Sequence, residues 1–247
     1  VSALSLVGEE AMDPVLNVVG GGQLVSGLYD ITPTLFGRVN NLTTWGSNYG
    51  DESSRYNGVL INLSARTRNG ITFQGGVNSG KTVTDTCAVR ANLPELSLTN
   101  PYCRTESAFI TRVTGLGSYT VPKVDVLFSG TFRSDQGAAL AANYTVTSAV
   151  AAQTLGRPLA GNTPNVSVNL IAPGTLYGDR VNEIDFRIAK ILRFGRTRTN
   201  VGFDIYNVLN ASPVLSYNQA FIPNGNWLVP TSVLQSRFVK FSASIDF

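Results

Sequence analysis

The sequence predicts an all-β protein: an antiparallel sheet whose strands are long enough to cross a membrane as the wall of a β-barrel. Apolar and polar residues alternate with a period of two in seven segments, as they do when successive side chains point to opposite faces of a strand. The links between these segments are alternately very short and long. Charged residues make up only 14% of the 247 residues, against about 25% in a typical soluble domain.

The alternation places each strand. In the first segment Val59, Ile61 and Leu63 alternate with Asn62 and Ser64, and the remaining segments repeat this pattern. Helical spacing fits poorly, because polar residues would fall on every face of a helix. The predicted strands span about 54–67, 71–80, 107–121, 123–133, 181–194, 197–209 and 236–247.

The links predict how the strands connect. The short ones lie at Arg68-Asn69-Gly70, whose Asn-Gly pair is typical of a type I′ hairpin, at Pro122 and at Gly195-Arg196. Short links therefore fall at one end of the sheet and long ones at the other, which is typical of outer-membrane barrels with periplasmic turns and extracellular loops. The predicted long extracellular loops are 81–106, 134–180 and 210–235.

Residues 54–247 are thus expected to form the barrel strands. Residues 1–53 are expected to be a loop or irregular region with at most one strand. The candidates for that eighth strand are Leu16, Val18, Val19, Leu24 and Val25. We expect the chain to be part of the wall of a larger barrel; a small closed barrel of eight strands is the alternative.

Composition excludes several functions. The chain has no His, so Ser-His-Asp catalysis, HExxH zinc sites and His-ligated haem are excluded, and we expect no enzyme activity, no cofactor and no metal site. A net charge of +3 is too small for electrostatic binding of nucleic acid. No run of 18 apolar residues is present, so a transmembrane helix is not expected. The chain begins at Val1 without a signal peptide, which indicates a processed chain or a fragment.

Two motifs need an interpretation. Residues 75–82 match the phosphate-loop pattern G-x-x-x-x-G-K-T, but no helix pattern follows and the segment continues the strand alternation, so we interpret it as strand. Cys87 and Cys103 lie in one predicted extracellular loop, where disulfides are stable. A bridge would close a loop of about 15 residues and contribute roughly 3 kcal/mol.

The polar positions of the strands carry charge. In a barrel they would point into the lumen, as a lining that contacts a plug or a permeant. The alternative is a hydrated interior whose charges compensate each other as ion pairs. The predicted lumen-facing residues are Glu183, Asp185, Arg187, Asp204, Lys240 and Asp246.

Several stretches resemble the C-terminal part of TonB-dependent receptor barrels, in the subset whose precursors carry a carboxypeptidase-regulatory-like domain. They include GLYDITPTLFGRVNNLTTWGSNYG at 27–50, VNEIDFRIAKILRFGRTRTNVGFDIYNVLNAS at 181–212 and WLVPTSVLQSRFVKFSASIDF at 227–247. The most specific parts are the final three predicted strands and the terminal Phe247. Further resemblance lies in 56–87, 115–144 and 170–180.

The resemblance implies energised uptake of a nutrient through the bacterial outer membrane by a barrel of 22 strands around a plug. Outer-membrane lipid, a plug domain, TonB and the barrel-assembly machinery would be the partners; this chain has neither a plug nor a TonB box. The implied assembly signal is Val239, Phe241, Ala243, Ile245 and Phe247.

Two other functions remain open from the sequence. A small passive outer-membrane pore would have an even number of strands with hydrogen bonding closed between the first and the last. A soluble β-sandwich binding module would bury the apolar positions between two sheets and expose an aromatic platform such as Trp45 or Trp227.

Overall fold

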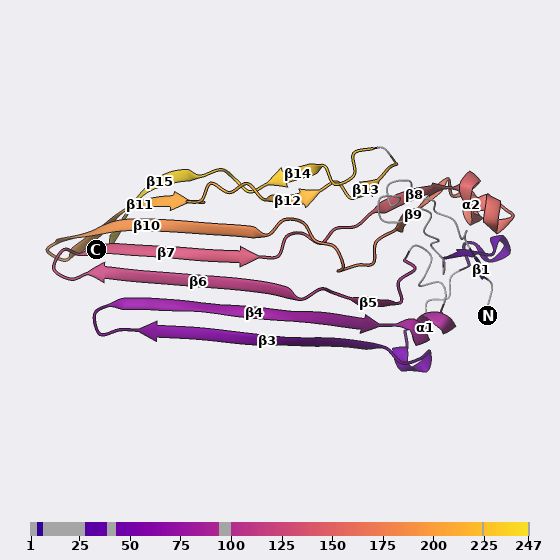
Figure 1. Cartoon of the computed structure of the whole chain (residues 1–247), viewed down its shortest axis with the longest axis horizontal. Helices are drawn as coiled ribbons and strands as arrows, with labels where there is room; N and C mark the ends of the chain where they lie inside the picture. The colour runs from indigo at the N-terminus through magenta and orange to yellow at the C-terminus, as the bar shows by residue number, and fades with distance from the viewer. Residues whose placement is uncertain (1–3, 7–27, 39–42, 94–99, 224, 247) are drawn as a thin grey trace.

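The computed structural model describes residues 4–6, 28–38, 43–93, 100–223 and 225–246. It is all-β, with 54% strand and 11% helix, so the predicted class is confirmed. One antiparallel sheet dominates it, and seven long strands lie side by side in chain order (Figure 1). These are β3 (Ser53–Arg66), β4 (Ile71–Asp85), β6 (Ile110–Val121), β7 (Val126–Asp135), β10 (Val181–Phe194), β11 (Thr197–Tyr206) and β15 (Phe238–Asp246).

The strand predictions are confirmed within a few residues at each end. The largest difference is in β4, which continues to Asp85 rather than ending at residue 80. The segment 75–82 that matches a phosphate loop lies inside β4, paired on both sides by β3 and β6. Its glycines are therefore strand residues.

The three short turns lie at one end of the sheet, together with the end of β15, and the long links lie at the other (Figure 1). The predicted type I′ turn after β3 is wrong. That turn needs positive φ at both central residues, but in this link only Gly70 has one, at 82°. The Gly70 N–H donates to the Thr67 carbonyl (3.1 Å). The link is thus a longer hairpin turn with the left-handed glycine at its end.

The sheet is open within the described residues. β3 and β15 are its edges, and they do not pair with each other. Two short strands, β1 (Leu4–Leu6) and β2 (Tyr29–Ile31), pair with one another away from this sheet, where at most one strand was expected before residue 53. The candidate eighth strand at 16–25 lies outside the described residues.

The long links, which were predicted as long loops, contain short helices and strands. The first contains α1 (Cys87–Asn92) and β5 (Arg104–Glu106). The second contains β8 (Asn143–Thr147), α2 (Ser148–Leu155), the 3-10 turn Ala160–Asn162 and β9 (Asn165–Asn169). The third contains β12 (Val214–Tyr217), β13 (Ala220–Phe221) and β14 (Pro230–Val233). Further 3-10 turns span Pro33–Leu35 and Gly46–Asn48.

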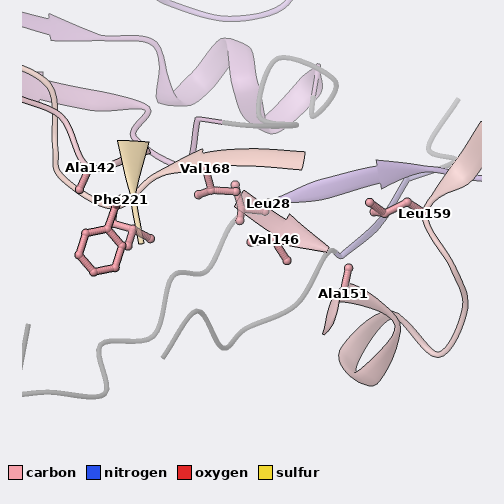
Figure 2. Packing of buried hydrophobic residues seen from close by; sticks show 8 residues of the cluster. Leu28, Ala142, Val146, Ala151, Leu159, Val168 and Phe221 are labelled. Carbon is pink, nitrogen blue, oxygen red and sulfur yellow. The ribbon is translucent and has the colours of Figure 1, made fainter. Parts of the chain in front are cut away.

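We call β8, α2, β9 and β13 the loop module. Helix α2 is capped at both ends. The Thr147 hydroxyl accepts a hydrogen bond from the Val150 N–H (3.4 Å), and Gly156 terminates the helix in the left-handed region, at φ 70°. The module encloses a hydrophobic cluster, part of which Figure 2 shows. An ion pair from Arg157 to Asp30 joins β2 to it. The buried members are Leu28, Ala142, Val146, Ala151, Leu159, Val168, Leu170 and Phe221.

No helix in the described part of the chain is both long and apolar enough to cross a membrane.

We predict that Phe221→Ala unfolds the loop module while leaving the long strands folded. Phe221 is 3% exposed and packs on Tyr144 and Trp227, so its truncation should cost about 3–5 kcal/mol. Hydrogen exchange should show lost protection in β8 and β9 and unchanged protection in β6 and β7. The control is Ile222→Ala at the next position, which is 60% exposed and should change little. Equal effects of the two variants would contradict this account of the module.

Candidate functional site

The long sheet has one apolar face and one polar face. Strand register puts the apolar positions of all seven strands on the same side, because each ladder is continuous and antiparallel. We call this side the apolar face. Its apolar members include Val59, Ile61, Leu63, Ala65, Ile71, Phe73, Gly75, Val77, Val113, Gly115, Gly117, Tyr119, Val121, Val126, Phe128, Gly130, Phe132, Ile184, Phe186, Ile188, Leu192, Phe194, Val201, Phe203, Ile205, Val239, Phe241, Ala243 and Ile245.

The apolar face is uncovered within the described residues. Large side chains on its outer strands, including Ile61, Leu63, Phe241 and Ile245, are exposed, and Phe73 and Phe132 nearer the middle are exposed too. Monomeric soluble proteins rarely expose an apolar patch larger than a few hundred Å². The burial between two sheets that a sandwich would need is therefore not seen here.

The apolar residues form a band that slants across the strands. One row of register partners runs from Ala65 through residues 73, 117, 130, 186 and 205 to Val239. In β3 the apolar run 59–65 is centred three residues to the loop side of this row, whereas in β15 the run 239–245 is centred three residues to the turn side. The band thus shifts by about six residues over six strand-to-strand steps. With about 3.3 Å per residue and 4.8 Å per strand, its slope is about 35° to the rows.

The predicted lumen-facing residues share the polar face. Arg187 lies directly opposite Asp204, which lies opposite Lys240. The Arg187 guanidinium donates to both Asp204 oxygens (3.0 and 3.3 Å), and the Ser242 hydroxyl donates to the same carboxylate (3.4 Å). Asp204 is only 4% exposed. Arg187 and Asp204 therefore form a compensated pair rather than a free charged lining.

A second ion-pair chain crosses β6, β7 and β10 on the same face. Arg112 pairs with Asp135 (2.8 Å), Asp135 with Arg133 (3.5 Å), and Arg133 with Glu183 (2.7 Å). Of these four residues the sequence analysis singled out only Glu183. Arg133 and Glu183 are direct register partners on β7 and β10, and Asp135 lies two residues beyond Arg133 on β7. These relations become visible only once strand register is known.

Asp185 has a structural role in the strand end. It accepts from the backbone N–H of Asn207 (2.9 Å) and from the Thr131 hydroxyl (3.4 Å). Asn207 is itself buried, and its amide donates to the carbonyls of Ala211 and Gln235 (both 2.8 Å). These bonds fix the chain where it leaves β11.

The other predicted residues are placed as follows. Lys240 is exposed on the polar face, and the Cα of Asp246 lies opposite Arg198. Of the assembly signal, Val239, Phe241, Ala243 and Ile245 lie on the apolar face of the edge strand β15, and Phe247 lies outside the described residues. Of the two candidate aromatic platforms, Trp45 is 81% exposed, whereas Trp227 packs on Phe221 and donates to the Ala141 carbonyl (3.1 Å).

Cys87 and Cys103 form a disulfide with their Cα atoms 4.7 Å apart. The bridge holds α1 against β5, and the Thr86 N–H also donates to the Cys103 carbonyl (2.9 Å).

Two groups near this link have shifted pKa values. Burial raises the pKa of Tyr102, next to Cys103. At the end of β5, the hydrogen bond and charge of Lys81 lower the pKa of Glu106.

Among the described residues, no group of three or more His, Cys, Asp or Glu side chains could hold a metal ion. No protein-family model, no curated protein and no solved structure matches the chain.

We predict that Asp204→Asn lowers stability by about 1.5–3 kcal/mol, because it weakens a charged hydrogen bond at a buried site and leaves Arg187 without its counter-ion. Thermal unfolding measures the loss. The control is Arg193→Gln, which breaks an exposed pair with Asp125 and should cost about 0–1 kcal/mol. A loss for Asp204→Asn no greater than the control's would show that the pair is dispensable.

Proposed function

We propose that the chain is part of the wall of a β-barrel that spans the bacterial outer membrane, as the barrel portion of a TonB-dependent receptor for nutrient uptake. The observation that carries this proposal is the exposed apolar band that slants across all seven long strands.

The slope of the band has a physical cause in a membrane. Barrel strands tilt by about 35–45° from the barrel axis. The hydrocarbon layer lies at one height, so its apolar residues must shift along each successive strand. The required shift is close to one residue per strand at this tilt, and the band of this sheet shifts by that amount.

The composition of the apolar face supports the same proposal. Four of its residues are glycines (Gly75, Gly115, Gly117 and Gly130), and they lie next to each other on β4, β6 and β7. A packed protein core would leave voids at such positions, and each void would lower stability. Fluid lipid chains can fill an uneven surface, so glycines are tolerated there.

The polar face supports a hydrated interior. Its charges are paired across strands, by Arg187 with Asp204 and by Arg133 with Glu183. Ion pairs keep the wall close to neutral and hold adjacent strands in register. We propose no catalytic role for these residues, and a plug or a permeant would contact them in the assembled receptor.

The open edges of the sheet support a wall that belongs to a larger barrel. β3 and β15 each leave one side without a partner in the described residues, and such edges are unstable in a membrane because unpaired backbone groups have no water to bind. Further strands of the receptor would pair with them. The plug and the TonB contact would belong to the same receptor, and β15 would be the segment that the assembly machinery reads.

We predict that Ile61→Arg impairs membrane insertion and that Leu60→Arg does not. The two residues are adjacent and almost equally exposed, at 62% and 65%, but lie on opposite faces of β3. Ile61 would face lipid, where an arginine costs about 2–4 kcal/mol near the midplane. Leu60 would face water.

Heat-modifiable migration on gels and co-flotation with lipid vesicles measure insertion of the two variants. A soluble protein would tolerate both substitutions equally. The proposal is therefore wrong if the two variants behave alike, or if the unmodified chain stays soluble and monomeric without detergent.

A further inference from the structure

A groove lies on the apolar face where two glycines meet. Gly117 of β6 and Gly130 of β7 are direct register partners, and the groove around them has a volume of about 350 Å³. Aromatic side chains form much of its walls, from Phe73, Phe128 and Phe186. A side-chain carbon built at Gly117 would meet no atom within 4 Å, so the groove is open above the strands. Its lining is mostly apolar, which suits a hydrocarbon chain.

The turn end of the sheet is strongly basic. The three short turns, the neighbouring strand residues and the end of β15 contain seven Lys or Arg residues but only two acidic residues, Asp125 and Asp246. The basic residues are Arg66, Arg68, Lys123, Lys190, Arg193, Arg196 and Arg198. The ladder ends on the loop side carry balanced charges, such as Lys81 with Glu106 and Arg104 with Asp85. The excess positive charge of the sheet is therefore confined to one end.

Lys190 connects the groove to this basic end. It lies on the apolar face of β10, two residues beyond Ile188, which pairs with the groove residue Phe128. Its ammonium donates to the Val124 carbonyl in the turn that also contains Lys123. An ammonium has three N–H donors, and within the described residues neither Lys190 nor Lys123 forms an ion pair. Both lysines are exposed, so both cations are available to an anion.

We propose that the groove and these two lysines bind an anionic phospholipid of the phosphatidylglycerol class, from the leaflet at the turn end of the barrel. One acyl chain lies along Gly117 and Gly130, and the phosphate lies against Lys190 and Lys123. This inference rests on the proposed membrane function. It adds a specific lipid site, since a uniform lipid contact would need neither the groove nor the charge at one end.

The charge complementarity favours this occupant over a zwitterionic lipid. Basic residues beside a membrane are attracted by anionic headgroups, and the attraction falls within a Debye length. Phosphatidylethanolamine with the same acyl chains fills the groove equally well, but its amine cancels the charge that the lysines would recognise.

Native mass spectrometry of the full chain in detergent tests the site, with phosphatidylglycerol and phosphatidylethanolamine of identical acyl chains in equal amounts. We expect phosphatidylglycerol to be retained about fivefold or more over phosphatidylethanolamine. Gly117→Leu should fill the groove and lower retention of both lipids. Lys190→Gln should leave the groove intact and lower the preference for phosphatidylglycerol about threefold.

Two matched controls accompany these variants. Gly115→Leu adds the same side chain on the same strand outside the groove, where its nearest neighbour is the Phe132 Cβ at 3.9 Å. Lys240→Gln removes the same charge from the polar face. Both should retain lipid as the unmodified chain does.

Equal retention of the two lipids, or controls that lose as much as the test variants, would overturn the lipid site. Co-flotation with phosphatidylcholine vesicles separates this result from failure of the proposed function. A chain that floats with vesicles but shows no preference contradicts the lipid site alone. A chain that does not float contradicts the membrane function and the lipid site together.

Discussion

The register of six consecutive antiparallel ladders is the constraint on which the rest of the structure depends. Side chains alternate along a strand, so a slip by one residue would turn every side chain of that strand to the other face. No ladder between the seven long strands contains such a slip. As a result the apolar residues of seven separate segments form one surface, and the ion pairs of the polar face meet across strands. Both features would be lost if the register of a single hairpin changed.

The same constraint explains where the folded core of the chain lies. The long sheet buries little of its own apolar surface, and its apolar face is left for another medium. The compact hydrophobic cluster is instead built by the loop module, where Val168 and Phe221 are almost fully buried. A protein with its packed core beyond the end of its main sheet differs from a soluble sandwich, whose core lies between the sheets. In the barrel wall that we propose, lipid would take the place of a second sheet.

The long strands and the ends at which they turn could be predicted from the sequence, because a half-buried strand leaves a local pattern of period two. The folded links could not, since β8, β9 and β13 are short and pair through contacts distant in sequence, such as Ala220 with Asn143. The Gly70 turn was mispredicted because Asn-Gly also suits longer hairpins. For the polar face, the residue types were visible, but the partners of Glu183 and Arg187 depend on register. The disulfide between Cys87 and Cys103 followed from their place in one link.

A depth measurement tests the slanted apolar band most directly. Nitroxide labels placed one at a time along 59–65 and 239–245 report accessibility to oxygen, which concentrates in lipid, and to a water-soluble nickel complex. The account predicts that lipid and water alternate from residue to residue. It also predicts that Ile61 and Leu63 are the deepest lipid-facing positions in β3, and Phe241 and Ala243 the deepest in β15. Accessibility without alternation would contradict it, as would a depth maximum at the register-row positions Ala65 in β3 and Val239 in β15.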